Sequence, residues 1–323
     1  MTALLLSVEG LVKHYLSGGF LSRATPPVKA VDGVSFTIAA GETLGLVGES
    51  GSGKSTVGRA VLRLEPPTSG VVRFEGKDLA TLDAATMRTT RRRMQIVFQD
   101  PLGALNPRRT IGDSVAEGLI IHQLASKHDL GDRVAQLLEE VGLDASYAGR
   151  YPHEFSGGQR QRVGIARALA VEPRFVVCDE PVSALDVSVQ AQVLNLLLDL
   201  RDRRQLAYLF IAHDLAVVQQ VAHRVAVMYL GTIVELGPAR SIISTPRHPY
   251  SQALVSAVPD PDPARHRSRI VLEGEPPSPA APPPGCPFAP RCFHPRRDTR
   301  CSAERPALRT IGDRDVACHY ADS

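Results

Sequence analysis

Short apolar segments alternate with helically spaced apolar positions along the first 240 residues of the chain. Continuous or alternating apolar residues predict strands at 4–12, 28–40, 43–47, 174–178 and 207–212, and a pair of strands within 224–236. Apolar residues at helical spacing predict helical structure over 54–64, 113–141 and 187–204. Apolar strands that alternate with helices indicate an α/β fold with a largely parallel sheet.

Proline marks a change of pattern near residue 240. Of the 25 prolines, nine precede Leu200 and sixteen lie from Pro238 onward, so residues 276–290 are expected to be loop or polyproline-like. We therefore predict one domain over 1–240 and a C-terminal region over 241–323. Two local expectations are an insertion-like loop at 17–27 and a helix that starts at Pro249.

The composition is that of a globular protein. Of the 323 residues, 43% are hydrophobic and 22% are charged, which excludes a disordered, collagen-like or disulfide-scaffold chain. The net charge of +3 gives no reason to expect nucleic acid or an anionic membrane as the main partner. The chain has no run of about 18 apolar residues, and Met1–Leu6 lacks a secretory n-region, so we expect a cytosolic compartment.

A glycine-rich segment lies between the predicted strand 43–47 and the predicted helix 54–64. Gly48-Glu-Ser-Gly-Ser-Gly53-Lys54-Ser55 fits the pattern G-x-x-x-x-G-K-[ST]. Glycines let consecutive backbone N–H groups turn toward phosphate oxygens, and the N-terminus of a helix favours the same negative charge. In such a loop Lys54 reaches the β- and γ-phosphates and Ser55 ligates Mg²⁺.

An acidic pair ends the predicted strand at 174–178. Such a strand delivers Asp179 and Glu180 to the carboxyl edge of the sheet, where α/β proteins bind ligands. Asp179 can hold Mg²⁺, and Glu180 can orient and polarise the attacking water. A GTPase would use an Asn-Lys-x-Asp motif, but neither of the two asparagines, Asn106 and Asn195, precedes a lysine.

The segment Phe155-Ser156-Gly157-Gly158-Gln159-Arg160 resembles the signature sequence of ATP-binding-cassette ATPases. The family usually has Leu where this chain has Phe155. Other segments resemble further family elements in the same order: Gln99 the Q-loop, Ser183-Ala184-Leu185-Asp186 the D-loop, His213 the switch histidine, and Tyr15 the ring that stacks on adenine. The resemblance implies a P-loop NTPase cassette with a RecA-like core, an antiparallel β part and a helical subdomain at about 102–165.

The resemblance also assigns a role to each matching residue. It implies that Glu180, His213 and Gln99 are catalytic and that Mg²⁺ is held by Ser55, Gln99 and Asp179. It implies that Ser156, Gly157, Gly158 and Gln159 complete the ATP site of a partner subunit, so that two cassettes enclose two ATP molecules. The residues expected to bind ATP are Tyr15, Gly48, Ser50, Gly51, Ser52, Gly53, Lys54, Ser55 and Thr56.

The C-terminal third is similar to one branch of this family. Thr245-Pro-Arg-His248-Pro249-Tyr250 resembles the segment after the cassette in oligopeptide and dipeptide importer ATPases, and residues 28–36 resemble their second ATPase subunit. This implies a subunit at the cytoplasmic face of the membrane that energises peptide import. Its implied partners are a second ATPase subunit, two permease subunits and an extracytoplasmic substrate-binding protein, with no nucleic acid.

Four of the five cysteines crowd the last forty residues with the spacing C-x5-C-x8-C-x16-C. Cytosolic thiols stay reduced, so a metal or cluster is a better explanation than disulfides. Zinc sites usually contain close C-x2-C pairs, which this segment lacks, although His294 and His319 could take part. Importer ATPases with this tail resemble carriers of a [4Fe–4S] cluster, which implies Cys286, Cys292, Cys301 and Cys318 as its ligands; zinc and free thiols stay open. Cys178 is expected in the core.

Three other functions remain open at this point. An importer of nickel, glutathione or another small solute would use the same ATPase subunit. A soluble cassette protein of translation or repair usually has two cassettes or a long coiled coil, and this chain has neither. A metal-dependent redox or nucleic-acid-binding module would be centred on the cysteines.

Overall fold

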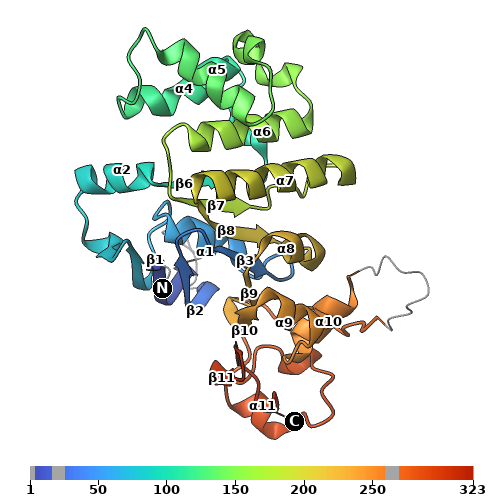
Figure 1. Cartoon of the computed structure of the whole chain (residues 1–323). Coiled ribbons are helices and arrows are strands. Elements are labelled where there is room, and N and C mark those ends of the chain that lie inside the picture. The colour runs from blue at the N-terminus through green and yellow to red at the C-terminus, as the bar shows by residue number, and fades with distance from the viewer. Residues whose placement is uncertain (1–3, 17–25, 259–268, 323) are drawn as a thin grey trace. The chain divides into compact units, whose positions relative to one another are not determined.

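The computed structural model of the chain describes residues 4–16, 26–258 and 269–322 (Figure 1). They pack into two compact units. The first is built mainly on Thr81–Phe210, and the second on Leu4–Ile38, Thr43–Ala80 and Ile211–Ser323. Most of the predicted insertion-like loop, at 17–25, lies outside the described residues.

Three helices pack together in the first unit: α4 (Ile111–Ile121), α5 (Leu130–Glu140) and α6 (Gly157–Leu169) (Figure 1). On α5 the buried Val134, Leu137 and Leu138 follow helical spacing and form its apolar stripe. The helical pattern over 113–141 is thus two helices rather than one. The other elements of this unit are α2 (Ala84–Arg92), β6 (Met94–Val97), α3 (Pro101–Ala104), η2 (Ala145–Gly149), η3 (Pro152–Glu154), β7 (Phe175–Asp179), α7 (Val187–Arg204) and most of β8 (Ala207–Ala212).

The second unit contains two groups of strands. One is a four-stranded sheet with the order β2-β1-β4-β5, made of β2 (Val28–Ala39), β1 (Leu4–Tyr15), β4 (Ser69–Phe74) and β5 (Lys77–Asp78). In the other, β3 (Thr43–Val47) pairs in parallel with β9 (Arg224–Tyr229), and β10 (Thr232–Pro238), β12 (Arg314–Val316) and β11 (Arg309–Ile311) follow in antiparallel. The predicted largely parallel sheet is therefore mixed here, because the late strands add as hairpins.

Short helices complete the second unit. They are η1 (Leu79–Thr81, shared with the first unit), α1 (Lys54–Val61), α8 (Leu215–Val221), α9 (Ala239–Ser244), α10 (Pro249–Ser256), η4 (Ala289–Arg291) and α11 (Thr299–Ala303). The start of α10 at Pro249 confirms that prediction, and Cys178 is fully buried as expected. Residues 269–288 contain no helix or strand, in agreement with the proline-rich pattern.

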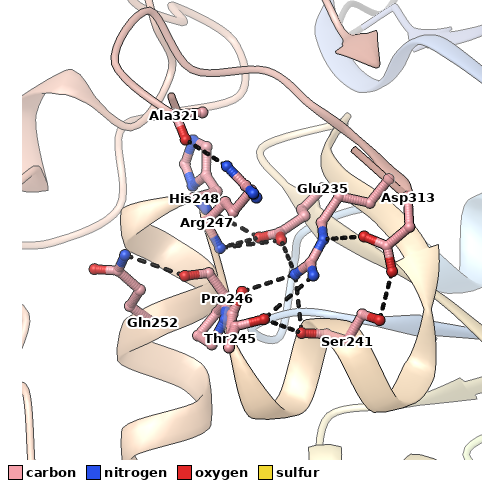
Figure 2. A network of polar contacts seen from close by, with 10 residues as sticks. Glu235, Ser241, Thr245, Pro246, Arg247, His248, Gln252, Asp313 and Ala321 are labelled. Atoms are coloured by element: carbon pink, nitrogen blue, oxygen red, sulfur yellow. Dashed lines mark hydrogen bonds and ion pairs between the residues drawn. The ribbon is translucent and has the colours of Figure 1, made fainter. Parts of the chain in front are cut away.

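A buried ion pair fastens the late strand β12 to β10 (Figure 2). Glu235 on β10 is fully buried, and its Oε1 lies 3.4 Å from Nη1 of Arg314 on β12. The same guanidinium donates to the carbonyl oxygens of Ser241 at 2.9 Å and Thr245 at 2.7 Å. Because both charged groups have several hydrogen-bond partners, the free-energy cost of burying this ion pair is offset.

Glu235 also holds the segment that leads into α10 (Figure 2). Its carboxylate accepts hydrogen bonds from the backbone N–H groups of Arg247 at 3.1 Å and His248 at 3.0 Å. His248 is the N-cap of α10, and its Nδ1 accepts from the backbone N–H of Tyr250 at 3.0 Å. The His248-Pro249-Tyr250 segment therefore caps a helix and ties it to the sheet.

The buried His248 makes stability depend on pH. Burial lowers the pKa of His248 from 6.5 to about 3, so the imidazole is neutral in the folded chain. Below pH 6.5 the unfolded chain binds a proton that the folded chain excludes, so the free energy of unfolding falls as the pH drops toward 3. We expect a loss of about 2 kcal/mol between pH 7 and pH 5, measured by denaturant unfolding. His248→Asn keeps an N-cap acceptor without the titration and should lose that much less stability over this range; equal losses in both proteins would contradict the prediction.

Candidate functional site

The glycine-rich segment wraps around the ammonium group of Lys54. It connects β3 to α1, and Lys54 is the first residue of that helix. The buried Nζ donates to the carbonyl oxygens of Gly48 at 2.8 Å and Glu49 at 2.9 Å. The loop thus has the strand–loop–helix context that a phosphate-binding loop requires.

Close approach of neighbouring strands explains the two glycines at the ends of this loop. Both have positive φ, 156° at Gly48 and 103° at Gly53. A Cβ on Gly53 would lie 2.0 Å from the carbonyl oxygen of Ala30 on β2, and one on Gly48 would lie 2.1 Å from that of Met228 on β9. Larger residues therefore cannot replace either glycine without displacing a strand.

The loop also contains a buried hydroxyl that no protein group satisfies. Ser52 is 5% exposed, and its Oγ has no hydrogen-bond partner among the described residues. A buried hydroxyl without a hydrogen-bond partner, close to glycine backbone N–H groups and a lysine, fits a phosphate ligand. The predicted neighbours Ser50, Gly51, Ser55 and Thr56 lie in the same loop and in the first turn of α1.

Two predicted site residues of the first unit, Gln99 and Ser183, contact Glu180. Asp179 is the last residue of the buried strand β7, and Glu180 follows it with φ 47°, a conformation that is strained for a residue with a side chain. Nε2 of Gln99 donates to Oε2 of Glu180 at 3.1 Å and lies 3.4 Å from Oγ of Ser183. The Q-loop, the acidic pair and the D-loop are therefore in contact in this unit.

The signature segment forms the N-terminus of α6. Ser156 is the N-cap, its Oγ accepts from the backbone N–H of Gln159, and Oε1 of Gln159 accepts from the backbone N–H of Ser156 at 2.9 Å. This capping box orients both residues and leaves Ser156 exposed. Phe155, where the family has Leu, is buried and packs edge-on against Tyr147 with the ring centroids 5.6 Å apart. The phenylalanine side chain is therefore part of the hydrophobic core.

Glycine is required at the end of the signature. A Cβ on Gly158 would lie 2.3 Å from Cγ1 of Val189 in the first turn of α7, whereas Gly157 is exposed. The D-loop residues Ser183, Ala184, Leu185 and Asp186 lead into that helix, and Asp186 is its N-cap, accepting from the backbone N–H of Val189 at 3.0 Å. This hydrogen bond is the main reason that the pKa of Asp186 is lowered.

Tyr15 and His213 belong to the second unit. Tyr15 is 37% exposed, its hydroxyl donates to the Glu65 carboxylate, and Nζ of Lys13 lies 5.0 Å from its ring centroid. His213 is exposed directly after β8, and the next residue, Asp214, is the N-cap of α8. Glu180 and Ser156 belong to the first unit.

The predicted cluster site is not supported by the structure. Burial raises the pKa of Cys286 to about 11 and also raises the pKa of Cys292 and Cys318, with a smaller contribution from neighbouring thiols. The described residues nevertheless contain no group of three or more Cys, His, Asp or Glu side chains arranged to hold a metal ion. The two histidines considered for zinc have other partners: His294 stacks on Tyr320, and His319 lies 3.0 Å from the carbonyl oxygen of Glu304.

Sequence reasoning missed two residues that contact the glycine-rich loop. The hydroxyl of Tyr250 accepts from the backbone N–H of Glu49 at 2.8 Å, and Nη1 of Arg291 lies 2.9 Å from Oε2 of Glu49. Tyr250 lies 201 residues from Glu49 and Arg291 lies 242 residues from it. No local pattern encodes contacts over such separations.

Known proteins resemble the chain over almost its whole length. Residues 31–183 match the family model "ABC transporter", and residues 234–301 match "Oligopeptide/dipeptide transporter, C-terminal region". The di/tripeptide transport ATP-binding protein DppF of Pseudomonas aeruginosa is 47% identical over 98% of this chain and 98% of its own length. The chain belongs to the ATP-binding subunits of peptide ABC transporters.

Two further relatives also match almost the whole of this chain. The oligopeptide transport ATP-binding protein AppF of Bacillus subtilis is 48% identical over 98% of this chain and 97% of its own length. The "Probable peptide ABC transporter ATP-binding protein y4tS" of Sinorhizobium fredii is 54% identical over 99% of this chain and 90% of its own. This subunit is thus an ATPase of the ABC transporter family.

Solved structures confirm the cassette fold. The ATP-binding cassette MJ0796, in a dimer bound to ADP and Pi, is 28% identical, with a TM-score of 0.65, and the match covers 73% of this chain and 99% of that one. The predicted P-loop NTPase fold of the cassette type is therefore confirmed. Within the described ranges, no helix of this subunit has the length and apolar character needed to cross a bilayer.

Proposed function

We propose that this subunit couples ATP hydrolysis to the import of oligopeptides or dipeptides from the cytoplasmic face of a membrane. The observation that carries the proposal is the combination of the Gln99–Glu180–Ser183 contacts with whole-chain similarity to peptide transport ATPases. In this proposal residues 1–240 are the motor domain, and residues 241–323 are the region that identifies the peptide branch.

The residues described above have distinct roles in this proposal. Lys54 and the N–H groups of Gly48–Thr56 hold the phosphates of ATP, and Tyr15 stacks on its adenine. Ser55, Gln99 and Asp179 hold Mg²⁺, which when bound neutralises charge on the β- and γ-phosphates. Ser156–Gln159 and the D-loop residues Ser183–Asp186 face a partner subunit.

Glu180 is the proposed general base. Gln99 donates to its carboxylate, and the strained backbone holds the side chain beyond the end of β7. A carboxylate in this position can orient a water molecule toward the γ-phosphate and accept a proton from that water. His213 is proposed to donate to the γ-phosphate and to report its loss.

We propose that a hollow in the first unit contacts a permease subunit. It encloses about 140 Å³ beside the Q-loop and is lined by residues that include Phe98, Pro101 and Arg167. Phe98 is 38% exposed although it is aromatic. We propose that two permease subunits, a second ATP-binding subunit and an extracytoplasmic binding protein complete the transporter.

We also propose that the four C-terminal thiols act together, as a [4Fe–4S] site or, alternatively, as a zinc site. The support is that the backbone N–H of Cys286 donates to the carbonyl oxygen of Cys301 at 2.8 Å, and that neighbouring thiols contribute to the raised pKa of Cys286 and Cys318. Ligation would need rearrangement of the side chains and lowered thiol pKa values. Iron and sulfide in anaerobically purified protein would support the cluster, stoichiometric zinc would replace it by a zinc site, and neither metal would reject both.

The import function is tested with the assembled transporter. We expect the subunit to co-purify with permease subunits and to drive ATP-dependent accumulation of short peptides in membrane vesicles. A complex with Lys54→Ala should lose this accumulation, because its phosphate site lacks the lysine. Accumulation of another solute instead of peptides would reassign the cargo, and failure to associate with membrane subunits would contradict the proposal.

A further inference from the structure

Two side chains of the C-terminal region contact Glu49 in the glycine-rich loop. They come from two separate elements of the region, α10 and η4. The hydroxyl of Tyr250, in the first turn of α10, accepts from the backbone N–H of Glu49 at 2.8 Å, and Nη1 of Arg291, at the end of η4, lies 2.9 Å from Oε2 of Glu49. All three residues belong to the second unit.

Packing holds both side chains in place. Tyr250 is fully buried, and its ring centroid lies 4.7 Å from that of Tyr229 and 5.4 Å from that of Phe288. Phe288, 1% exposed, precedes η4, and its carbonyl oxygen accepts from the backbone N–H of Arg291 at 3.0 Å. The aromatic cluster thus joins α10 to η4, and the Arg291 side chain is only 9% exposed.

Glu49 contacts the lysine of the glycine-rich loop. Its carbonyl oxygen and that of Gly48 accept from Nζ of Lys54, so its peptide group takes part in orienting the lysine. Its carboxylate carries the same charge as a phosphate ligand and would repel one. Arg291 pairs with that carboxylate in a largely buried setting, where a charge-assisted hydrogen bond is strong.

We infer that Tyr250 and Arg291 are positioning residues of the ATP site, through which the C-terminal region sets the affinity of this subunit for ATP. Tyr250 fixes the peptide group of Glu49, and Arg291 neutralises its carboxylate and holds it in one orientation. The inference rests on the assignment of Gly48–Ser55 as the phosphate loop. It gives the His248-Pro249-Tyr250 segment a purpose beyond capping α10.

The expected signature is a change in KM for ATP rather than in kcat. The proposed proton acceptor, Glu180, and its partner Gln99 belong to the first unit, whereas Tyr250 and Arg291 belong to the second. In the assembled transporter, Arg291→Ala and Tyr250→Phe should each raise KM for ATP about tenfold, with kcat changed less than about twofold. Arg291→Lys should restore part of the loss, because it keeps the charge but not the planar fork.

A double-mutant cycle separates this role from a purely structural one. Glu49→Gln should remove most of the penalty of Arg291→Ala, because the two charges then disappear together. Arg300→Ala serves as the matched control: Arg300 lies in the same region, is 56% exposed and pairs with Glu304. It should leave KM unchanged. Thermal unfolding of each variant shows whether it is folded, and Tyr250→Phe keeps the packed ring.

Lys54→Ala distinguishes failure of the inference from failure of the loop assignment. Direct binding of Mg·ATP is the probe. If Lys54→Ala binds Mg·ATP as the unmodified protein does, the assignment of the loop is wrong. If Lys54→Ala loses binding while Tyr250→Phe and Arg291→Ala keep both their KM and their affinity, the inference is overturned. Equal effects of Arg291→Ala with and without Glu49→Gln would also overturn it.

Discussion

Glu180→Gln is expected to lower the ATP turnover of the assembled transporter at least about 100-fold, because a general base contributes a factor of that order or more. The amide has the shape of the carboxylate, and its oxygen can still accept from Gln99, which donates to Oε2 of Glu180 at 3.1 Å. It cannot take a proton from water. Phosphate release at saturating ATP measures the loss, and the affinity for Mg·ATP should be preserved.

A matched control for this variant is Glu139→Gln. Glu139 is an exposed residue of α5, and the same charge change there should leave turnover unchanged. Normal turnover by the Glu180→Gln complex would show that another group activates the water. A loss of Mg·ATP binding in that complex would mean that Glu180 acts in binding rather than in proton transfer.

Glu235→Ala is expected to reduce the free energy of unfolding by about 3–5 kcal/mol, the usual cost of removing one partner from a buried ion pair. Glu235 is fully buried, and its carboxylate accepts from Arg314 and from two backbone N–H groups that precede α10. Without it, the guanidinium of Arg314, whose side chain is 5% exposed, would lose its buried counter-ion and keep only the half-exposed carboxylate of Asp313. Denaturant unfolding measures the difference.

The double variant Glu235→Leu, Arg314→Met tests the reason for that loss. Replacing both members of a buried pair by apolar residues is often neutral, so the double variant should recover much of the lost stability. If it is as unstable as Glu235→Ala, packing or the backbone contacts matter more than the buried charge. Glu235→Ala should also raise KM for ATP if the segment before α10 positions Tyr250.

Local patterns were sufficient where the chemistry is contained in a short segment. The glycine-rich loop with α1 after it and the strand that ends at Asp179 were predicted, because each depends on spacing within a few residues. The strand at 43–47, the helix at 187–204 and the strand at 207–212 were also found, because each is long or strongly apolar. The short strands β11 and β12 were missed, since three residues carry no detectable period.

The C-terminal region shows where sequence reasoning stops. The predicted helix start at Pro249 is confirmed, but the partners of that helix were not foreseen. The crowding of four cysteines and the resemblance to peptide-importer ATPases predicted a cluster site, whereas the described side chains form no metal-binding group. A spacing constrains which residues can meet and does not specify how their side chains are oriented.

The sequence by itself determined the family and pointed to the proposed phosphate loop and catalytic residues, because these depend on residue types at short, fixed separations. Only the tertiary structure decided that Gln99 lies against Glu180, that Glu235 pairs with Arg314, and that Tyr250 and Arg291 meet Glu49. These contacts join residues 79 to 242 positions apart. Contacts of this kind follow from how strands and helices pack, which no local pattern of residues specifies.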